Sequence, residues 1–176
     1  MNRHAVIVTL ALGLTLQTTA GADIVSSSDS HYVLRHEAAS SLAPDALWQR
    51  LIDPASWWHP DHTYSGDANN LTLELEAGGH WREDWDGNSV AHGRVLYVDA
   101  AKRTLRMDAP FGPLQGMGAY TVWTITISPI GDDGSLVVFD ETSIAPPTDD
   151  MEAIAQAVDS VKSVAIRLLA VVPDGS

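Results

Sequence analysis

Short runs of alternating apolar and polar residues occupy most of the chain between residues 71 and 141. Alternation with period two predicts strands that bury one face, and the dipeptide Asp86-Gly87 between two such runs predicts a tight hairpin turn. We therefore predict about six strands in hairpin succession, preceded by one earlier strand. The predicted strands cover residues 32–39, 71–75, 80–85, 89–99, 104–108, 120–127 and 136–139.

Two short helices are predicted between the first strand and the hairpins. The segment 42–52 carries its apolar residues on one face and Pro44 in its first turn, where the missing N–H of proline costs nothing. Asp53 is the predicted N-cap of a second short helix, which carries Trp57 and Trp58.

The C-terminal segment returns to helical spacing after Pro146-Pro147. Thr148 is its predicted N-cap, and Lys162 and Arg167 stand toward the end where the helix dipole favours positive charge. Apolar residues recur at steps of three and four, which predicts a long amphipathic helix. These residues are Ile154, Val158, Val161, Ala165, Leu168 and Leu169.

This order of elements predicts an α+β helix-grip fold. A curved antiparallel sheet of about six to seven strands wraps around the long C-terminal helix, which is the only element large enough to cover one face of the sheet. Strong twist in such a sheet leaves a gap beneath the helix, and a gap lined by tryptophan is a candidate ligand pocket. Residues 31–172 form one domain, with no second linker or repeat.

The N-terminus has the pattern of a secretory signal peptide over residues 1–22. Arg3 precedes a short apolar run, and the small residues Ala20-Gly21-Ala22 provide a cleavage site after Ala22. The apolar run is too short to span a bilayer. We therefore expect an exported, periplasmic or secreted protein, with residues 23–30 as a flexible lead-in to the domain.

Charge and cysteine content exclude several classes of function. The formal net charge is −13, with 23 acidic and 10 basic residues, and no basic stripe is present. Such a surface disfavours binding to nucleic acid and docking to anionic lipid. The chain has no cysteine, which excludes disulfides, thiolate zinc sites and cysteine nucleophiles.

Three segments resemble the START-like helix-grip proteins, also called the SRPBCC superfamily. Residues 43–58 resemble their first helix and tryptophan pair, 76–83 their glycine-turn strand, and 93–99 the strand that follows. The likeness extends from Tyr32 to about Leu169 and is greatest to the branch named for activators of a heat-shock ATPase. That superfamily includes lipid carriers, hormone receptors, polyketide cyclases and co-chaperones, so the resemblance implies the fold and leaves the activity open. A co-chaperone role needs a cytosolic partner and conflicts with an export signal.

The aromatic residues are the first candidate ligand contacts. Trp57 and Trp58 end the second short helix at the predicted pocket mouth, where one of them is expected to be structural. Trp81 and Trp85 share a strand face with Glu83, and we expect that face to be buried because burial of two indoles outweighs burial of the opposite, polar face. The predicted ligand-binding residues are Trp57, Trp58, Trp81, Glu83, Trp85, Met107, Phe111, Trp123 and Phe139.

Two carboxylates are candidate catalytic groups. Glu83 would anchor a ligand hydroxyl or amine, or act as a general acid or base, because a buried carboxylate is costly unless it is paired or protonated. The structural alternative pairs it with Arg94 or Arg106 across the sheet. Glu141 shares a face with Phe139 and is placed to meet Glu83 inside the cavity.

A metal or cofactor has little support in the sequence. His59, Asp61 and His62 form a compact cluster of metal-ligand types, but their spacing matches no zinc pattern, and a solvated loop is the default interpretation. No glycine-rich nucleotide loop and no nucleophile elbow occurs. We expect no metal and no cofactor.

The sequence favours an exported carrier or sensor that holds a small hydrophobic or aromatic molecule between the sheet and the C-terminal helix. The alternative is a cyclase- or hydrolase-type enzyme with Glu83 or Glu141 as general acid or base and a raised pKa at that carboxylate. A third possibility is an adaptor of the cytosolic type, recognised by its surface. The oligomeric state and the identity of the ligand are not readable from the sequence.

Overall fold

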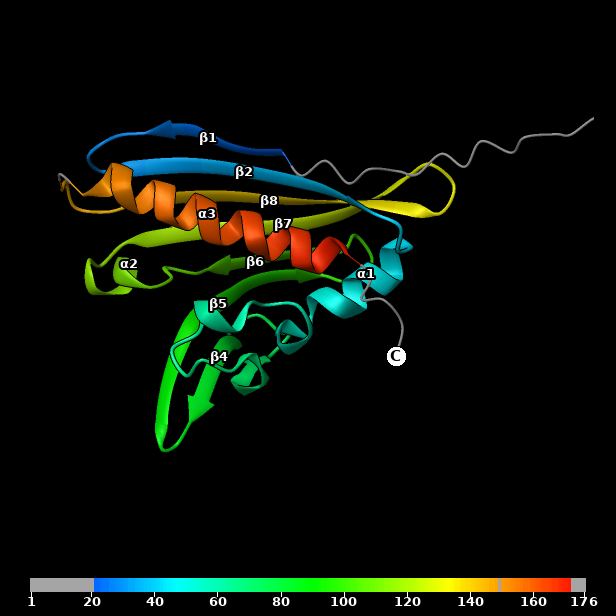
Figure 1. The fold of residues 1–176 in the computed structure, drawn as a ribbon, viewed down its shortest axis with the longest axis horizontal. Helices are drawn as coiled ribbons and strands as arrows, with labels where there is room; N and C mark the ends of the chain where they lie inside the picture. The colour runs from blue at the N-terminus through cyan, green and yellow to red at the C-terminus, as the bar shows by residue number, and fades with distance from the viewer. Residues whose placement is uncertain (1–20, 149, 172–176) are drawn as a thin grey trace, which may run out of the picture.

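The computed structural model describes residues 21–148 and 150–171. An eight-stranded antiparallel sheet has the order β1-β2-β8-β7-β6-β5-β4-β3, and the long helix α3 (Met151–Ala170) lies across it (Figure 1). The α+β architecture predicted from the sequence is confirmed. The strands are β1 (Gly21–Ser27), β2 (His31–Ser40), β3 (Leu71–Leu73), β4 (His80–Trp85), β5 (Asn88–Asp99), β6 (Thr104–Asp108), β7 (Tyr120–Ile130) and β8 (Gly134–Ile144).

The sheet has one strand more than predicted because β1 lies where a flexible lead-in was expected. Residues 23–27 pair with β2 in an antiparallel register that begins at Gly21↔Glu37. Their alternating pattern is too short to stand out in the sequence, but β2 offers a free edge, and the β-branched Ile24 and Val25 suit a strand. The predicted signal segment lies outside the described residues up to residue 20.

The predicted hairpin between β4 and β5 is confirmed in detail. Trp85 pairs with Asn88, so that Asp86 and Gly87 are the only residues in the turn. Both have positive φ, 44° and 80°, as a type I′ turn requires. This turn matches the twist of the two strands and fixes their register.

The helices after β2 are shorter and more numerous than predicted. Helix α1 (Pro44–Leu51) buries Leu47, Trp48 and Leu51, as its periodicity indicates. The second predicted helix is a single 3₁₀ turn, η1 (Pro54–Ser56), with Asp53 at its N-cap. The following segment contains two further 3₁₀ turns, η2 (Pro60–His62) and η3 (Ala68–Asn70), where the sequence predicts a loop.

The other helices follow turns rich in proline or glycine. Helix α2 (Pro113–Gly116) is one turn that follows Gly112, which has a φ of 58°. The N-cap of α3 is Asp150 and not Thr148. Thr148 still contributes, because its hydroxyl accepts a hydrogen bond from the N–H of Asp150.

Within the described ranges, no helix is long and apolar enough to cross a membrane.

The tryptophan-rich core fills the concave side of the sheet under the C-terminal half of α3. Trp81, Trp123 and Phe139 are fully buried there, together with Ile166 and Leu169 of the helix. The N-terminal half of α3 packs separately, against Tyr32 and Leu34 of β2 and Leu114 of α2. The two halves of the helix therefore rest on different parts of the molecule.

Candidate functional site

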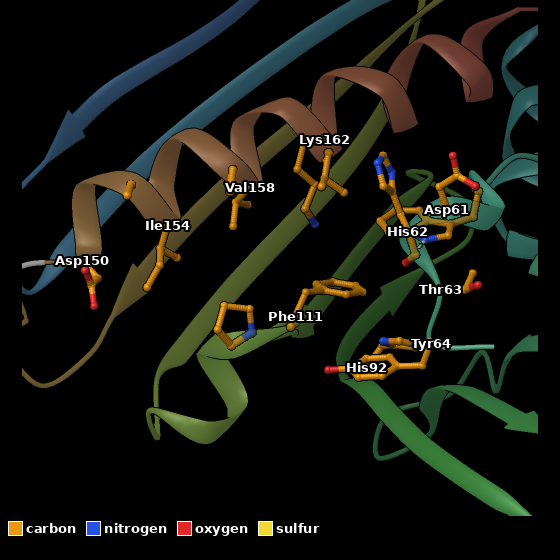
Figure 2. Close-up of a pocket in the computed structure, with 16 residues that line it drawn as sticks. Asp61, His62, Thr63, Tyr64, His92, Phe111, Asp150, Ile154, Val158 and Lys162 are labelled. Atoms are coloured by element: carbon orange, nitrogen blue, oxygen red, sulfur yellow. Dashed lines mark hydrogen bonds between the residues drawn. The ribbon is translucent and has the colours of Figure 1, made fainter. Parts of the chain in front are cut away.

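A cavity of about 570 Å³ opens beneath α3 (Figure 2). We call it the α3 cavity. Its wall is formed by one face of the helix, the segment 58–64 that contains η2, His92 of β5, and residues 111–113 at the start of α2. The lining residues are Trp58, Asp61, His62, Thr63, Tyr64, His92, Phe111, Gly112, Pro113, Asp150, Ala153, Ile154, Ala157, Val158, Val161 and Lys162.

The cavity exists because α3 covers only one part of the sheet. The helix packs on β1, β2 and β8, at one edge of the strand order, whereas β4 and β5 lie toward the other edge (Figure 1). The 3₁₀ turns cover the face of that second part. The space between the helix and these turns stays open. The helix side chains that line it are mostly small or medium in size, and the long side chain of Lys162 is paired with Glu141.

The structure separates the predicted ligand contacts into two groups. Trp58 and Phe111 line the α3 cavity. Trp57, Trp81, Met107, Trp123 and Phe139 do not, and lie in the core. Trp85 is half-buried and stacks on Tyr64 with 6.5 Å between ring centroids.

The indoles pack against one another instead of forming a wall. Trp58 meets Trp81 edge to face at 5.0 Å between centroids, and Trp81 stacks on Trp123 at 5.8 Å. Phe111 stacks on Trp58 at 5.6 Å and closes the cluster on the cavity side. Such aromatic contacts stabilise a rigid core. The cavity is therefore bounded by the aromatic cluster and is not enclosed within it.

Glu83 is fully buried, as its strand face predicts, and all its contacts favour the ionised form. Its Oε1 accepts the N–H of Ser65 at 2.5 Å, and its Oε2 accepts the N–H of Tyr64 at 3.0 Å and lies 2.8 Å from Nε2 of His92. Burial alone would raise the pKa of Glu83, but the hydrogen bonds from Ser65, Tyr64 and His92 outweigh it and lower that pKa below the ordinary value. The prediction that this carboxylate has the raised pKa of a general acid is therefore wrong.

The alternative prediction, that Glu83 pairs with Arg94 or Arg106, is also wrong. Arg94 and Arg106 are exposed on the opposite face of the sheet. For Arg94, the cause is a β-bulge in β5. Trp81 pairs with Gly93 and Arg82 with Ala91, so that His92 is the extra residue. The bulge turns both His92 and Gly93 inward and reverses the alternation beyond them. His92 thereby reaches Glu83, and Arg94 does not.

His92 is a neutral imidazole in the cavity wall. Burial lowers its pKa, although Glu83 acts in the opposite direction. An ionised carboxylate can only accept, so neutral His92 carries its proton on Nε2 and leaves the lone pair of Nδ1 free. No described residue forms a hydrogen bond to that Nδ1. Its ring is held between Phe111 and Tyr64, at 5.6 and 5.8 Å between centroids. His92 therefore presents a fixed acceptor in a largely apolar surface.

Glu141 does not join Glu83 but forms a second polar centre with Lys162 and Tyr32. Lys162 comes from α3 and is 1% exposed, and its Nζ lies 2.9 Å from Oε2 of Glu141. The ammonium and carboxylate are not aligned as a hydrogen bond, and neither of these two atoms has a hydrogen-bond partner among the described residues. The hydroxyl of Tyr32 donates to Oε1 of Glu141 at 2.7 Å.

Lys162 lies over the faces of two aromatic rings. Its Nζ is 2.9 Å from the ring centroid of Trp123 and 4.5 Å from that of Phe111, and Figure 2 shows the side chain extending from α3 toward Phe111. Burial lowers the pKa of Lys162 to about 8, against the opposing attraction of Glu141. The sequence places this lysine near the end of a helix dipole and gives no sign that it points inward.

Of the three metal candidates, Asp61 and His62 line the cavity, and His59 does not. His59 and His62 have ring centroids 5.4 Å apart, and Nδ1 of His59 accepts the N–H of Asp61 as a cap for η2. Burial, followed by the neighbouring His59, lowers the pKa of His62. Within residues 21–148 and 150–171, no three such side chains are grouped to hold a metal ion.

No family model matches the sequence, and no curated protein is significantly similar to it. Solved structures share its fold. A conserved protein of unknown function from Enterococcus faecalis superposes with a TM-score of 0.59 at 15% identity, over 92% of this chain and 81% of that one. A Rhodobacter sphaeroides protein gives 0.53 at 17%, over 85% and 95%. An aromatase/cyclase from Streptomyces sp. R1128 gives 0.54 at 12%, over 79% and 91%.

These likenesses confirm the helix-grip fold. At such low identity they show the fold alone, and they do not single out the branch of heat-shock ATPase activators within the superfamily.

Proposed function

We propose that this helix-grip chain binds a small, largely apolar molecule in the α3 cavity. The observation that carries the proposal is the cavity itself. Its volume of about 570 Å³ lies within the range of small-molecule sites. Its apolar wall of Trp58, Phe111, Ile154, Val158 and Val161 contains only a few polar groups. Such a wall gains free energy when an apolar guest displaces water.

The charges around the cavity favour a neutral guest. Asp61 and Asp150 line it, and its one cation, Lys162, is already paired with Glu141. An anionic molecule would meet net negative charge there and on the protein as a whole, whose net charge is −13. A ligand with an apolar body and a hydroxyl group that donates to Nδ1 of His92 fits best.

Ala157→Trp is expected to abolish binding of a neutral apolar probe. Ala157 lines the cavity but is exposed at its edge, so an indole there fills the opening without strain in the core. The measurement is a fluorescence titration with N-phenyl-1-naphthylamine, whose emission rises in apolar surroundings. We expect the affinity to fall at least about tenfold, which corresponds to 1.4 kcal/mol.

Gln156→Trp is the matched control. Gln156 is the preceding residue on α3, is exposed, and does not line the cavity. It should bind the probe like the unchanged protein. Equal loss in both variants, or binding unchanged in Ala157→Trp, would place the probe elsewhere.

An enzyme of the cyclase or hydrolase type is the second candidate, and His92 is the observation that favours it. His92 lines a ligand-sized cavity, its Nδ1 has no hydrogen-bond partner among the described residues, and buried Glu83 fixes its tautomer as in a general base. The acid–base group would then be His92, with Glu83 as the residue that positions it. Turnover lost in His92→Gln with probe binding retained would separate this function from simple binding.

We also propose that the protein acts after export. The signal-like segment 1–22 supports this. Cleavage after Ala22 would leave residues 23–27 to form the rest of β1 against β2. N-terminal sequencing of the native protein tests the proposal: a chain that starts at Asp23 supports it, and a chain that starts at Met1 contradicts it.

A further inference from the structure

The ammonium group of Lys162 is buried beside the α3 cavity. The lysine projects from the middle of α3, is part of the α3 cavity, and is shielded from bulk water by Phe111 and Trp123. A structural lysine normally extends its ammonium group to solvent. This ammonium group lies inside, next to one carboxylate and two ring faces, where a charged group is costly to keep.

The pair formed by Lys162 and Glu141 can exchange one proton without any change of net charge. The ammonium–carboxylate state and the amine–carboxylic acid state differ only in the position of that proton along a separation of 2.9 Å. A dry, apolar surrounding makes the neutral state accessible beside the charged one. The lowered pKa of Lys162, to about 8, agrees with this, since a useful fraction of the lysine is then a free amine near neutral pH.

Unused hydrogen-bond donors surround the same place. Nε1 of Trp123 is buried and has no hydrogen-bond partner among the described residues, and the same holds for Nζ of Lys162. Buried donors without partners are uncommon in folded proteins. Of the two residues, Lys162 lines the cavity, and a guest that brings an acceptor oxygen to this end would satisfy its ammonium group.

We propose that Lys162 forms a reversible imine with the carbonyl group of an apolar aldehyde or ketone bound in the α3 cavity. This inference rests on the proposed ligand-binding function and assigns its ligand class. An amine next to a carboxylic acid, buried beside an apolar pocket, is the combination that imine chemistry requires.

The steps balance within the site. Lys162 gives a proton to Glu141, and the free nitrogen pair attacks the carbonyl carbon to form a C–N bond. The carbonyl oxygen becomes a hydroxyl by taking up the proton that the nitrogen loses. Glu141 then protonates this hydroxyl, which leaves as water while the nitrogen pair forms the C=N bond. The resulting iminium ion stands opposite the Glu141 carboxylate, and Tyr32 holds that carboxylate through Oε1.

Four ionisable groups act on this chemistry besides the lysine. Glu141 and Tyr32 contact the pair directly from the sheet. His36 of β2 is close enough for the charge of Lys162 to lower the pKa of that histidine, after the larger effect of burial. Asp159 of α3 lies 2.9 Å from His36 and compensates its charge. A neutral His36 adds no positive charge beside the lysine. Because the pKa of Lys162 is about 8, its free amine and therefore imine formation should increase as the pH rises from about 7 toward 9.

The chain contains its own control, because its sequence has only two lysines, Lys102 and Lys162. Lys102 has an exposed side chain and an ion pair with Asp99 at 3.2 Å. The hydrogen bond to Asp99 raises the pKa of Lys102. The two lysines therefore differ in exposure and in protonation, and peptide mass mapping distinguishes them.

The experiment is reductive trapping with 2-naphthaldehyde and sodium cyanoborohydride on the full chain, followed by peptide mass mapping. We expect the reduced secondary amine on Lys162 to exceed that on Lys102 at least about tenfold, on the basis of their difference in free amine. N-phenyl-1-naphthylamine, which has no carbonyl group, should suppress the Lys162 adduct by competition. Lys162→Arg should lose this adduct, and Lys102→Arg should keep it.

The outcomes separate this inference from the binding function. If the protein binds N-phenyl-1-naphthylamine and the aldehyde competes, but Lys162 is trapped no more than Lys102, the imine is overturned and the binding function stands. If neither probe binds, both are overturned. Probe binding and thermal unfolding of Lys162→Arg verify that this variant is folded. If it is not folded, the comparison of trapped Lys162 with trapped Lys102 in the unchanged protein still decides whether the imine forms.

Discussion

Lys162→Met is expected to lower the free energy of unfolding by about 3 kcal/mol, because it leaves the carboxylate of Glu141 buried without its cation. Methionine has nearly the length of lysine and can lie on Trp123 and Phe111, so loss of packing contributes little. Urea denaturation measures the change. Lys102→Met, which removes the exposed lysine, is the matched control and should leave stability nearly unchanged.

The double variant Lys162→Met/Glu141→Gln should recover most of that loss. It removes both charges, and the glutamine oxygen still accepts the hydroxyl of Tyr32. A coupling energy of at least about 2 kcal/mol is expected from the cycle of the two single variants and the double variant. Additive losses would mean that the two groups do not act as a pair.

The pH dependence of stability provides a second readout of the same pair. The pKa of Lys162 is about 8 in the folded state and close to 10.5 in the unfolded state. Between these values the unfolded state binds more protons, so stability should rise with pH from about 8 to about 10. Above that, Tyr32, whose pKa is raised by burial and then by Glu141, reverses the trend. The rise should be absent in Lys162→Met.

Glu83→Ala is expected to cost about 3–5 kcal/mol, because each buried donor that loses its acceptor costs about 1–3 kcal/mol. The substitution leaves three buried donors without an acceptor: the N–H groups of Tyr64 and Ser65 and Nε2 of His92. Because Tyr64 and His92 both line the α3 cavity, probe binding should weaken as well. Urea denaturation and titration with N-phenyl-1-naphthylamine measure the two effects.

Asp84→Ala is the control for Glu83→Ala. Asp84 is the next residue on β4, is exposed, and among the described residues is paired with Arg82 alone. Its removal should change neither stability nor probe binding appreciably. If Glu83→Ala behaves like Asp84→Ala, Glu83 does not organise the cavity wall.

Much of the fold could be predicted because local patterns and tertiary packing agree. The Asp86-Gly87 turn, the alternation of β4 and the long period of α3 each specify one structure, and all three are present. The strand β1 could not be predicted, since its pairing depends on the free edge of β2 and not on its own sequence. The 3₁₀ turns η2 and η3 likewise depend on a few caps, from His59 and Asp67.

The candidate site was less predictable because two of its polar residues break the local rules. His92 points inward only through a bulge, which a period-two pattern cannot reveal. Lys162 points inward because the apolar stripe of α3 contains one lysine, and helical patterns normally place lysine on the solvent side. The burial of Glu83 was predictable from Trp81 on the same face, but its partners were not.

The position of the cavity also depends on packing that the sequence does not encode locally. Tryptophans were expected to line a gap beneath the helix, but Trp57, Trp81 and Trp123 lie in the core with Ile166 and Leu169. The open space lies instead beside Val158 and Val161, where most of the helix side chains are small or medium in size. The number of indoles thus indicates a rigid core, and the small residues of α3 mark the opening.

The most direct test of the ligand-binding function is methyl NMR spectroscopy of the full chain, titrated with N-phenyl-1-naphthylamine. Ile154, Val158 and Val161 line the α3 cavity, whereas Val25 and Ile144 are each 59% exposed and lie outside it. We predict saturable shifts concentrated on the first three residues. Shifts confined to Val25 and Ile144, or no saturable shift at all, would contradict the account.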